Sequence, residues 1–206
     1  MDTGFLISAF VTLFVVIDPI GLAPIFVALT AGMSQAQRRA IILRALIIAT
    51  GLLTVFAFIG EQVLDFMGIS MPAFRIAGGL LLFVTAFDML FERRTKRRED
   101  QSEEADAPDP SVFPMAMPLI AGPGSIATII LLVGQQPDVA GKAAILGVMA
   151  AVLAILAMTL LASGLIERAL GRTGVMVLTR LFGMLLAALS VQFVLDGLSD
   201  VWAGMG

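Results

Sequence analysis

The residues best suited to do chemistry in this chain lie within its apolar segments, at two places where helix-stopping residues interrupt them. The first interruption reads Asp18-Pro19-Ile20-Gly21 and is followed by Pro24; the second reads Gly122-Pro123-Gly124-Ser125. A carboxylate such as Asp18 inside an apolar stretch is a functional-site hypothesis by default. Matching interruptions in the two halves of a membrane protein are the best sequence indication of a solute-binding site.

Both interruptions carry residues that begin a helix. Asp18 is a strong N-cap residue, and Pro19 suits the first helical position because its missing N–H would have no partner there. Gly122 and Pro123 repeat this arrangement with a weaker cap, and Ser125 takes the third position. We therefore expect two half-helices that begin inside the membrane.

The two expected N-termini differ in charge. Both offer unpaired N–H groups and the positive end of a helix dipole. The first carries the Asp18 carboxylate, which suits an ammonium group or a coupling cation, whereas the second offers donors that suit a carboxylate. Gly21 and Gly124 leave room for a ligand near the backbone. A small zwitterion, such as an α-amino acid with a small neutral side chain, would satisfy both ends.

A purely structural interpretation stands beside this one. Proline and glycine are common in membrane helices, and Asp18 could serve only as the cap of its own half-helix. The two interpretations differ in whether Asp18 faces a polar cavity or only the helix that it caps.

Composition places the chain in a membrane. Of its 206 residues 59% are hydrophobic and 14% are charged, and the mean hydropathy is +0.99. The chain has no cysteine and no histidine, which removes thiolate and imidazole metal ligands and the Cys nucleophile. We expect no metal site, no cofactor and no enzymatic activity, since no nucleophile–base pair is visible. The net charge of -3 does not indicate nucleic-acid binding.

Apolar segments long enough for membrane helices, which need about 20 residues, occur three times in each half of the chain. They are Phe5–Thr30, Ile41–Ile59, Pro72–Phe91, Val112–Val133, Ala143–Ile166 and Val175–Leu198. We predict a first three-helix repeat (1–91), a charged linker (92–111) and a second three-helix repeat (112–206). An odd number of spans in each half inverts the second repeat. The expected fold is an all-α membrane protein with six transmembrane helices in two inverted repeats, the first helix of each broken near mid-membrane.

The halves also match in sequence. Arg75-x-x-Gly78 recurs as Arg180-x-x-Gly183, and Thr85, Glu61 and Pro19 correspond to Ser190, Glu167 and Pro123. Lys and Arg concentrate in the first, third and fifth loops, so the positive-inside rule predicts a cytoplasmic linker and external termini.

Secondary features give smaller predictions. Ser34 and Gln37 fit a capping box. Arg75 and Arg180 are expected either to reach the membrane interface or to pair with a carboxylate such as Glu61 or Glu167. Two small-residue sites, Gly78-Gly79 and Gly147 with Ala151, are expected to be close-packing positions between helices.

These motifs resemble the MarC family of bacterial and archaeal inner-membrane proteins over essentially the whole chain. The resemblance rests on Asp-Pro-Ile-Gly with its following proline, on Ala-Gly-Pro-Gly-Ser (121–125) and on the two Arg-x-x-Gly starts. It implies a transporter-like fold related to the lysine-exporter superfamily, with relatives that carry glycine and alanine in a cation-driven manner.

The combined expectation is a secondary transporter for small neutral amino acids in the cytoplasmic (inner) membrane, working by alternating access as one repeat rocks against the other, with H⁺ or Na⁺ as the coupling ion. Asp18 would bind the ammonium group or the ion, residues 19–21 would shape the cavity, and residues 122–125 would hold the carboxylate. Its partners would be a small zwitterionic solute and membrane lipid. The alternatives are a cation or metal-ion exporter and a non-transporting membrane scaffold.

Overall fold

The computed structural model describes residues 3–91, 93 and 109–203, and in these ranges the chain forms helices and no strand. The elements in chain order are α1 (Thr3–Ile17), α2 (Pro19–Leu29), α3 (Gln35–Phe66), α4 (Met71–Leu90), η1 (Ser111–Ile120), α6 (Pro123–Gly134), α7 (Val139–Leu161) and α8 (Ser163–Ala203). Most of the predicted linker, 92–111, lies outside the described residues.

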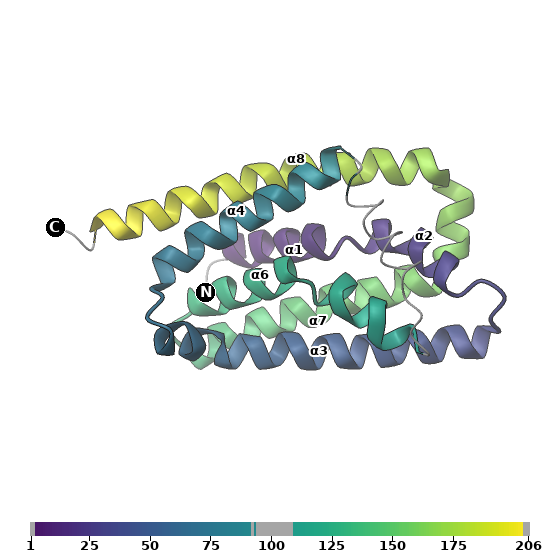
Figure 1. Ribbon diagram of the computed structural model, residues 1–206, viewed down its shortest axis with the longest axis horizontal. Helices are drawn as coiled ribbons and strands as arrows, with labels where there is room; N and C mark the ends of the chain where they lie inside the picture. Colours follow the sequence, from purple (N-terminus) through teal and green to yellow (C-terminus); the bar gives the residue numbers. More distant parts are fainter. Residues whose placement is uncertain (1–2, 92, 94–108, 204–206) are drawn as a thin grey trace.

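Five of the described helices are long and apolar enough to cross a membrane, counting α1 and α2 as one span of 27 residues. The bent pair of η1 and α6 makes a sixth if it is taken as one span. The prediction of an all-helical, multi-pass membrane protein is therefore confirmed. Figure 1 shows that α1 begins at the end of the bundle where α8 finishes, as an even number of crossings requires.

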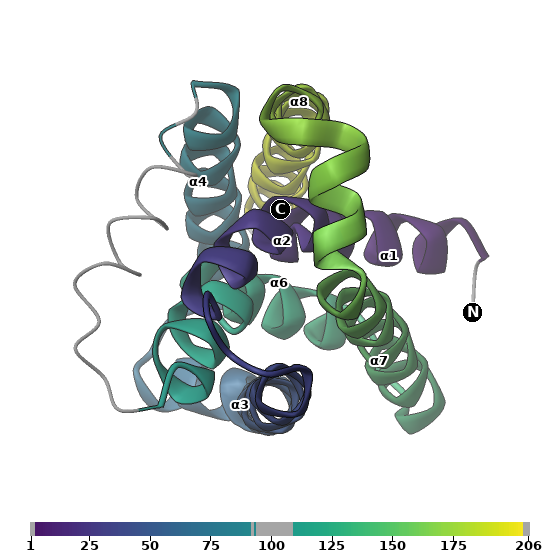
Figure 2. The same ribbon diagram turned by 90° about the vertical axis from the view of Figure 1, so that its right-hand side faces the viewer.

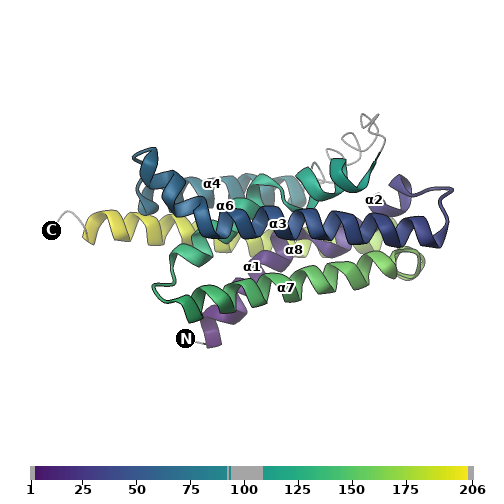
Figure 3. The ribbon, with the colours of Figure 1, turned by 90° about the horizontal axis from the view of Figure 1, so that it is seen from below.

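The helices form three layers. Viewed from the side and from the end, α4 and α8 make one outer layer, α3 and α7 make the other, and α1, α2 and α6 lie between them (Figures 1 and 2). Figure 3 views the molecule from the side of α3 and α7, whose long helices run over the segments behind them. The interrupted helices thus occupy the middle of the protein, and the outer layers consist of helices without a mid-span break.

The buried apolar residues form two clusters that follow these layers. The larger joins α1, α2, η1 and α6 to α3 and α7, with Leu13, Phe26 and Leu53 among its fully buried members. The smaller consists of Val15 and Val16 of α1 with residues of α4 and α8. Both halves of the chain contribute to each cluster, so the halves share one interior.

Glycines allow α4 and α8 to pack closely. A Cβ built on Gly79 would lie 2.8 Å from the backbone oxygen of Ser190, and one on Gly183 would lie 3.1 Å from that of Ala86. Gly78 faces α6 instead, where a Cβ would lie 2.8 Å from Leu131 Cδ1. The prediction of close packing at Gly78-Gly79 is confirmed. It is wrong for Gly147, where a Cβ would meet nothing within 4 Å.

Gly79→Ala is expected to destabilise the protein, because the new methyl group would press on backbone that cannot rotate away. Overpacking of this kind costs about 1–3 kcal/mol. Gly147→Ala is the matched control, since its methyl group enters open space and alanine favours the helix. Thermal unfolding in detergent measures both, and an unchanged midpoint for Gly79→Ala would contradict the close approach of α4 and α8.

The segment η1 differs from the regular half-helix that the sequence predicted. Phe113 and Met117 have extended backbone angles inside it, with φ of -127° and -135°. Each precedes a proline, Pro114 or Pro118, and a residue before proline is pushed out of the helical region by the pyrrolidine ring. The axis then turns by 54° between η1 and α6.

The carboxylate partner of Arg75 is not one of the two that the sequence suggested. Arg75 contacts Asp200 of α8 and not Glu61, whose carboxylate lies 4.0 Å from the Lys142 ammonium. Arg75 therefore pairs with a carboxylate, as one of the two expectations had it, but the partner lies on α8, a helix that the sequence alone does not identify as its neighbour. The capping box is confirmed, with Gln37 N donating to Ser34 Oγ and Ser34 N donating to Gln37 Oε1.

Asp109 precedes η1 outside the helices and is held by several donors. The hydroxyl and backbone N–H of Ser111 both donate to its Oδ1, and Arg44 Nη1 lies 3.0 Å from its Oδ2. The Ser111 hydrogen bonds, followed by the Arg44 charge, hold the pKa of Asp109 below its ordinary value. This stabilising contribution is present above the ordinary carboxyl pKa and is lost as the pH falls through the lowered value.

Candidate functional site

The first helix break is centred on Asp18, which ends α1 and begins α2. Its backbone lies in the left-handed region, with φ 58° and ψ 65°, and it is the single described non-glycine residue with a positive φ. Aspartate tolerates this conformation better than most residues, but it still costs energy there. Asp18 N–H continues the α1 ladder by donating to Phe14 O, while the following Pro19 has no N–H to place. The helix is therefore interrupted with little loss of backbone hydrogen bonding.

The Asp18 side chain caps α2 as the sequence predicted. Its Oδ1 accepts a hydrogen bond from Gly21 N at 3.0 Å, and the residue is 1% exposed. The carboxylate occupies the space that a side chain at position 21 would need, since a Cβ on Gly21 would lie 2.1 Å from Asp18 Oδ2. Glycine is therefore needed at position 21 to make room for the Asp18 carboxylate, whether or not it also leaves room for a ligand.

The second break is centred on Gly122, the N-cap of α6, with φ -78° and ψ 170°. Pro123 takes the first helical position, and the ladder of α6 starts with Ile126 N donating to Gly122 O at 3.0 Å. Pro118 O lies 2.4 Å from where a Cβ of Gly122 would be, so no larger residue fits against η1 here. The prediction of a glycine-capped half-helix that begins at this point is confirmed.

Both breaks fall close to the middle of their spans. Asp18 follows the 15 residues of α1 and precedes the 11 of α2, and Gly122 lies between the 10 residues of η1 and the 12 of α6. A span needs about 20 residues to cross the hydrocarbon core, so each break lies near the middle of a candidate span.

The tertiary structure brings the two breaks next to each other. The open side of Gly124, in the first turn of α6, faces Val16 at the end of α1, where a Cβ would lie 3.3 Å from Val16 Cγ1. The same position would be 3.8 Å from Thr85 Oγ1 of α4. The start of α6 thus meets the end of α1, next to the first break, and the α4 layer.

The predicted site residues are not equally enclosed. Asp18, Pro19, Gly21, Gly122 and Ser125 are buried, Ile20 and Gly124 are half-buried, and Pro123 is exposed. The pocket lined by Phe26, Arg38 and Arg168, at one end of the bundle, borders none of them. In this conformation the Asp18 carboxylate is shielded from both ends of the bundle and is held at least in part by its own half-helix.

Sequence reasoning missed one polar residue of this region, Thr128. It lies one turn beyond Ser125 on the same helix, is fully buried, and its hydroxyl has no hydrogen-bond partner among the described residues. A buried hydroxyl without a partner costs about 1–3 kcal/mol. The sequence could have indicated Thr128, because it follows Ser125 by three residues and residues at this spacing share a helix face.

Among the described residues no group of three or more His, Cys, Asp or Glu side chains could hold a metal ion. The chemistry that the two breaks offer is therefore that of one carboxylate, which caps α2, and of the amide donors and hydroxyls at the start of α6.

Comparison with known proteins gives relatives along the full chain. The family description that matches is "MarC family integral membrane protein", over residues 3–202. A UPF0056 membrane protein of Archaeoglobus fulgidus is 39% identical over 98% of this chain and 96% of its own length. The UPF0056 membrane protein YvbG of Bacillus subtilis is 34% identical over 98% of each chain, and the UPF0056 inner membrane protein YhgN of Escherichia coli K12 is 36% identical over 94% of this chain and 95% of its own. No solved structure matches.

Proposed function

The chain belongs to the MarC family of integral membrane proteins, and from this premise we propose that it is a secondary transporter that carries small neutral amino acids of the glycine and alanine type across the cytoplasmic membrane. Asp18 binds the ammonium group or the coupling cation, H⁺ or Na⁺. The N-terminus of α6, residues 122–125, binds the carboxylate. The protein acts by alternating access and needs no cofactor.

One observation supports this proposal most: the start of α6 packs at the break between α1 and α2, with Gly124 against Val16, two residues before Asp18. A helix start in this place supplies N–H donors and a positive dipole end to an anionic group. The carboxylate on the other start supplies the opposite charge. A small zwitterion matches this polarity better than a simple cation or anion does.

The packing supports the inverted-repeat part of the proposal. If α1, α2, α3 and α4 correspond to η1, α6, α7 and α8, the contacts of one half predict those of the other. The helix α3 packs against η1 and α6, and α7 packs against α1 and α2. Likewise α4 contacts α6, and α8 contacts α2. Each repeat in this proposal therefore places its third element, α3 or α7, against the broken helix of the other repeat.

From this interlocking we infer that the layers, and not the repeats, are the units that move. One repeat cannot rock freely against the other when each packs into its neighbour's core. The α4–α8 layer is joined to the middle layer by the smaller apolar cluster, in which Val15 and Val16 are the buried members from α1. We propose that this layer shifts against the rest and exposes the site to each side in turn, with the basic loops on the cytoplasmic side and the termini outside.

Uptake of labelled glycine and alanine into proteoliposomes tests the function. We expect accumulation above that of protein-free liposomes when a proton or sodium gradient is imposed, and competition by unlabelled alanine but not by lysine, whose charged chain does not suit an apolar middle layer. Absence of uptake of any amino acid under any gradient would contradict transport and favour the scaffold. Movement of cations without amino acid would favour the exporter.

A further inference from the structure

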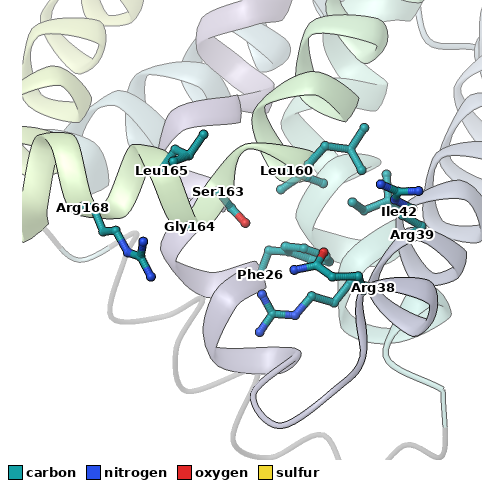
Figure 4. Close-up of a pocket in the computed structure, with 11 residues that line it drawn as sticks. Phe26, Arg38, Arg39, Ile42, Leu160, Ser163, Gly164, Leu165 and Arg168 are labelled. Atoms are coloured by element: carbon teal, nitrogen blue, oxygen red, sulfur yellow. The ribbon is translucent and has the colours of Figure 1, made fainter.

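A basic pocket of about 280 Å³ lies at one end of the bundle, away from the helix breaks. It is enclosed by the end of α2, the start of α3 and the junction of α7 with α8 (Figure 4). Its polar lining includes Arg38, Arg39 and Arg168, with Gln35 and Ser163. The guanidinium groups come from two helices that are far apart in the sequence, so the fold itself gathers them.

Within the described part of the chain, no acidic residue lines the pocket and none of its arginines forms an ion pair. Arg38 is fixed by a hydrogen bond from its Nη2 to Thr30 O, at 3.2 Å. Its Nε is buried and has no acceptor. Burying a guanidinium donor without an acceptor costs free energy, and an anionic oxygen in the pocket would relieve that cost.

The surroundings place this pocket at the boundary between water and lipid. Leu161 and Leu165 border it and are 58% and 70% exposed, as expected of side chains that face acyl chains. The first part of α8 runs across the end of the bundle before the chain turns at Gly171, φ 60°, into the long helix (Figure 2). Arginines with exposed leucines beside them at a helix end are typical of the headgroup layer.

We propose that this pocket binds the phosphate of an anionic phospholipid headgroup, with Arg38, Arg39 and Arg168 around the phosphate and the acyl chains along Leu161 and Leu165. The pocket lies on the side that the positive-inside rule makes cytoplasmic, where the leaflet surface is negative. The bound lipid connects the end of α2 and the start of α3 to the α7–α8 junction, and therefore ties the first half of the chain to the second.

Thermal unfolding of the full-length protein, delipidated in a neutral detergent, tests the proposal. We expect phosphatidylglycerol to raise the unfolding midpoint in a saturable way and phosphatidylcholine with the same acyl chains to have little effect. Arg39→Gln and Arg168→Gln should each weaken the phosphatidylglycerol affinity about fivefold, since a basic residue near a lipid surface contributes about 1 kcal/mol. Arg44→Gln is the control, because it removes the same charge from α3 outside the pocket.

Three results would overturn the proposal. Equal stabilisation by the two lipids would remove the phosphate selectivity, and an equal loss in Arg44→Gln would indicate general surface attraction. If inorganic phosphate alone, at saturating concentration, raised the unfolding midpoint as much as phosphatidylglycerol does, the pocket would be assigned to a soluble anion instead. Arg168 is exposed and makes no described hydrogen bond, so Arg168→Gln is expected to fold. It tests the pocket without disturbing the hydrogen bond that Arg38 makes to Thr30 O.

Discussion

Asp18→Asn is expected to abolish or strongly reduce amino-acid uptake while the protein stays folded. Asparagine has the same shape, also tolerates the left-handed backbone, and can still accept the hydrogen bond from Gly21 N. The variant therefore removes the charge and little else. A hydrogen bond to a charged group contributes about 1.5–3 kcal/mol, which corresponds to a loss of roughly 10- to 100-fold in transport rate at low substrate concentration.

The chain contains a matched control for this variant. Asp138 caps α7 through the same side-chain hydrogen bond, from Gly141 N at 3.2 Å, but its backbone is extended and it is exposed at the start of α7. Asp138→Asn should transport like the wild type. Initial rates of labelled alanine uptake, normalised to protein inserted in the liposomes, measure both variants. Wild-type rates for Asp18→Asn would exclude a role for the Asp18 charge and leave it as a helix cap.

Gly21→Ala is expected to impair transport as severely, although it removes no polar group. The new methyl carbon would lie 2.1 Å from Asp18 Oδ2 and 2.9 Å from Oδ1, so the carboxylate must leave its position. The hydrogen bond that caps α2 is then lost, at a cost of about 0.5–2 kcal/mol in stability. We expect a modest fall in the unfolding midpoint together with a loss of uptake that exceeds what the stability change explains.

The double variant distinguishes this mechanism from a general disturbance. If Gly21→Ala acts by displacing the Asp18 carboxylate, Asp18→Asn with Gly21→Ala should be little worse than either single variant, because residues that act through one group are not additive. Gly141→Ala is the control, since its methyl group would press on Asp138 and Gln136 at an exposed cap. Multiplicative losses in the double variant would show that the two residues act separately.

The close coupling of Asp18 and Gly21 bears on how the site opens. In this conformation the carboxylate is 1% exposed and is bonded to the helix that it caps. In the proposed transport cycle, a substrate ammonium group would reach the carboxylate only after the packing around the breaks loosens. The α4–α8 layer is the neighbour whose displacement would do this, because Gly124 faces Leu82 and Thr85 of α4 as well as Val16.

The sequence by itself determined the elements of this protein, because their causes are local. Apolar length sets which segments can cross a membrane, and Asp-Pro and Gly-Pro pairs set where a helix must restart. Both predicted starts, at Pro19 and Pro123, are where α2 and α6 begin. The irregular backbone of η1 could also have been predicted from the sequence, since Phe113 and Met117 each precede a proline.

The tertiary structure alone decided which elements meet. The contact of Gly124 with Val16, the pairing of Arg75 with Asp200 and the gathering of arginines at the end of the bundle join residues that are distant in the chain. In a membrane nearly every helix face is apolar, so hydrophobic pattern does not specify a partner and close packing at small residues does. Gly79 and Gly147 look alike in sequence, yet Gly79 alone has another helix against it.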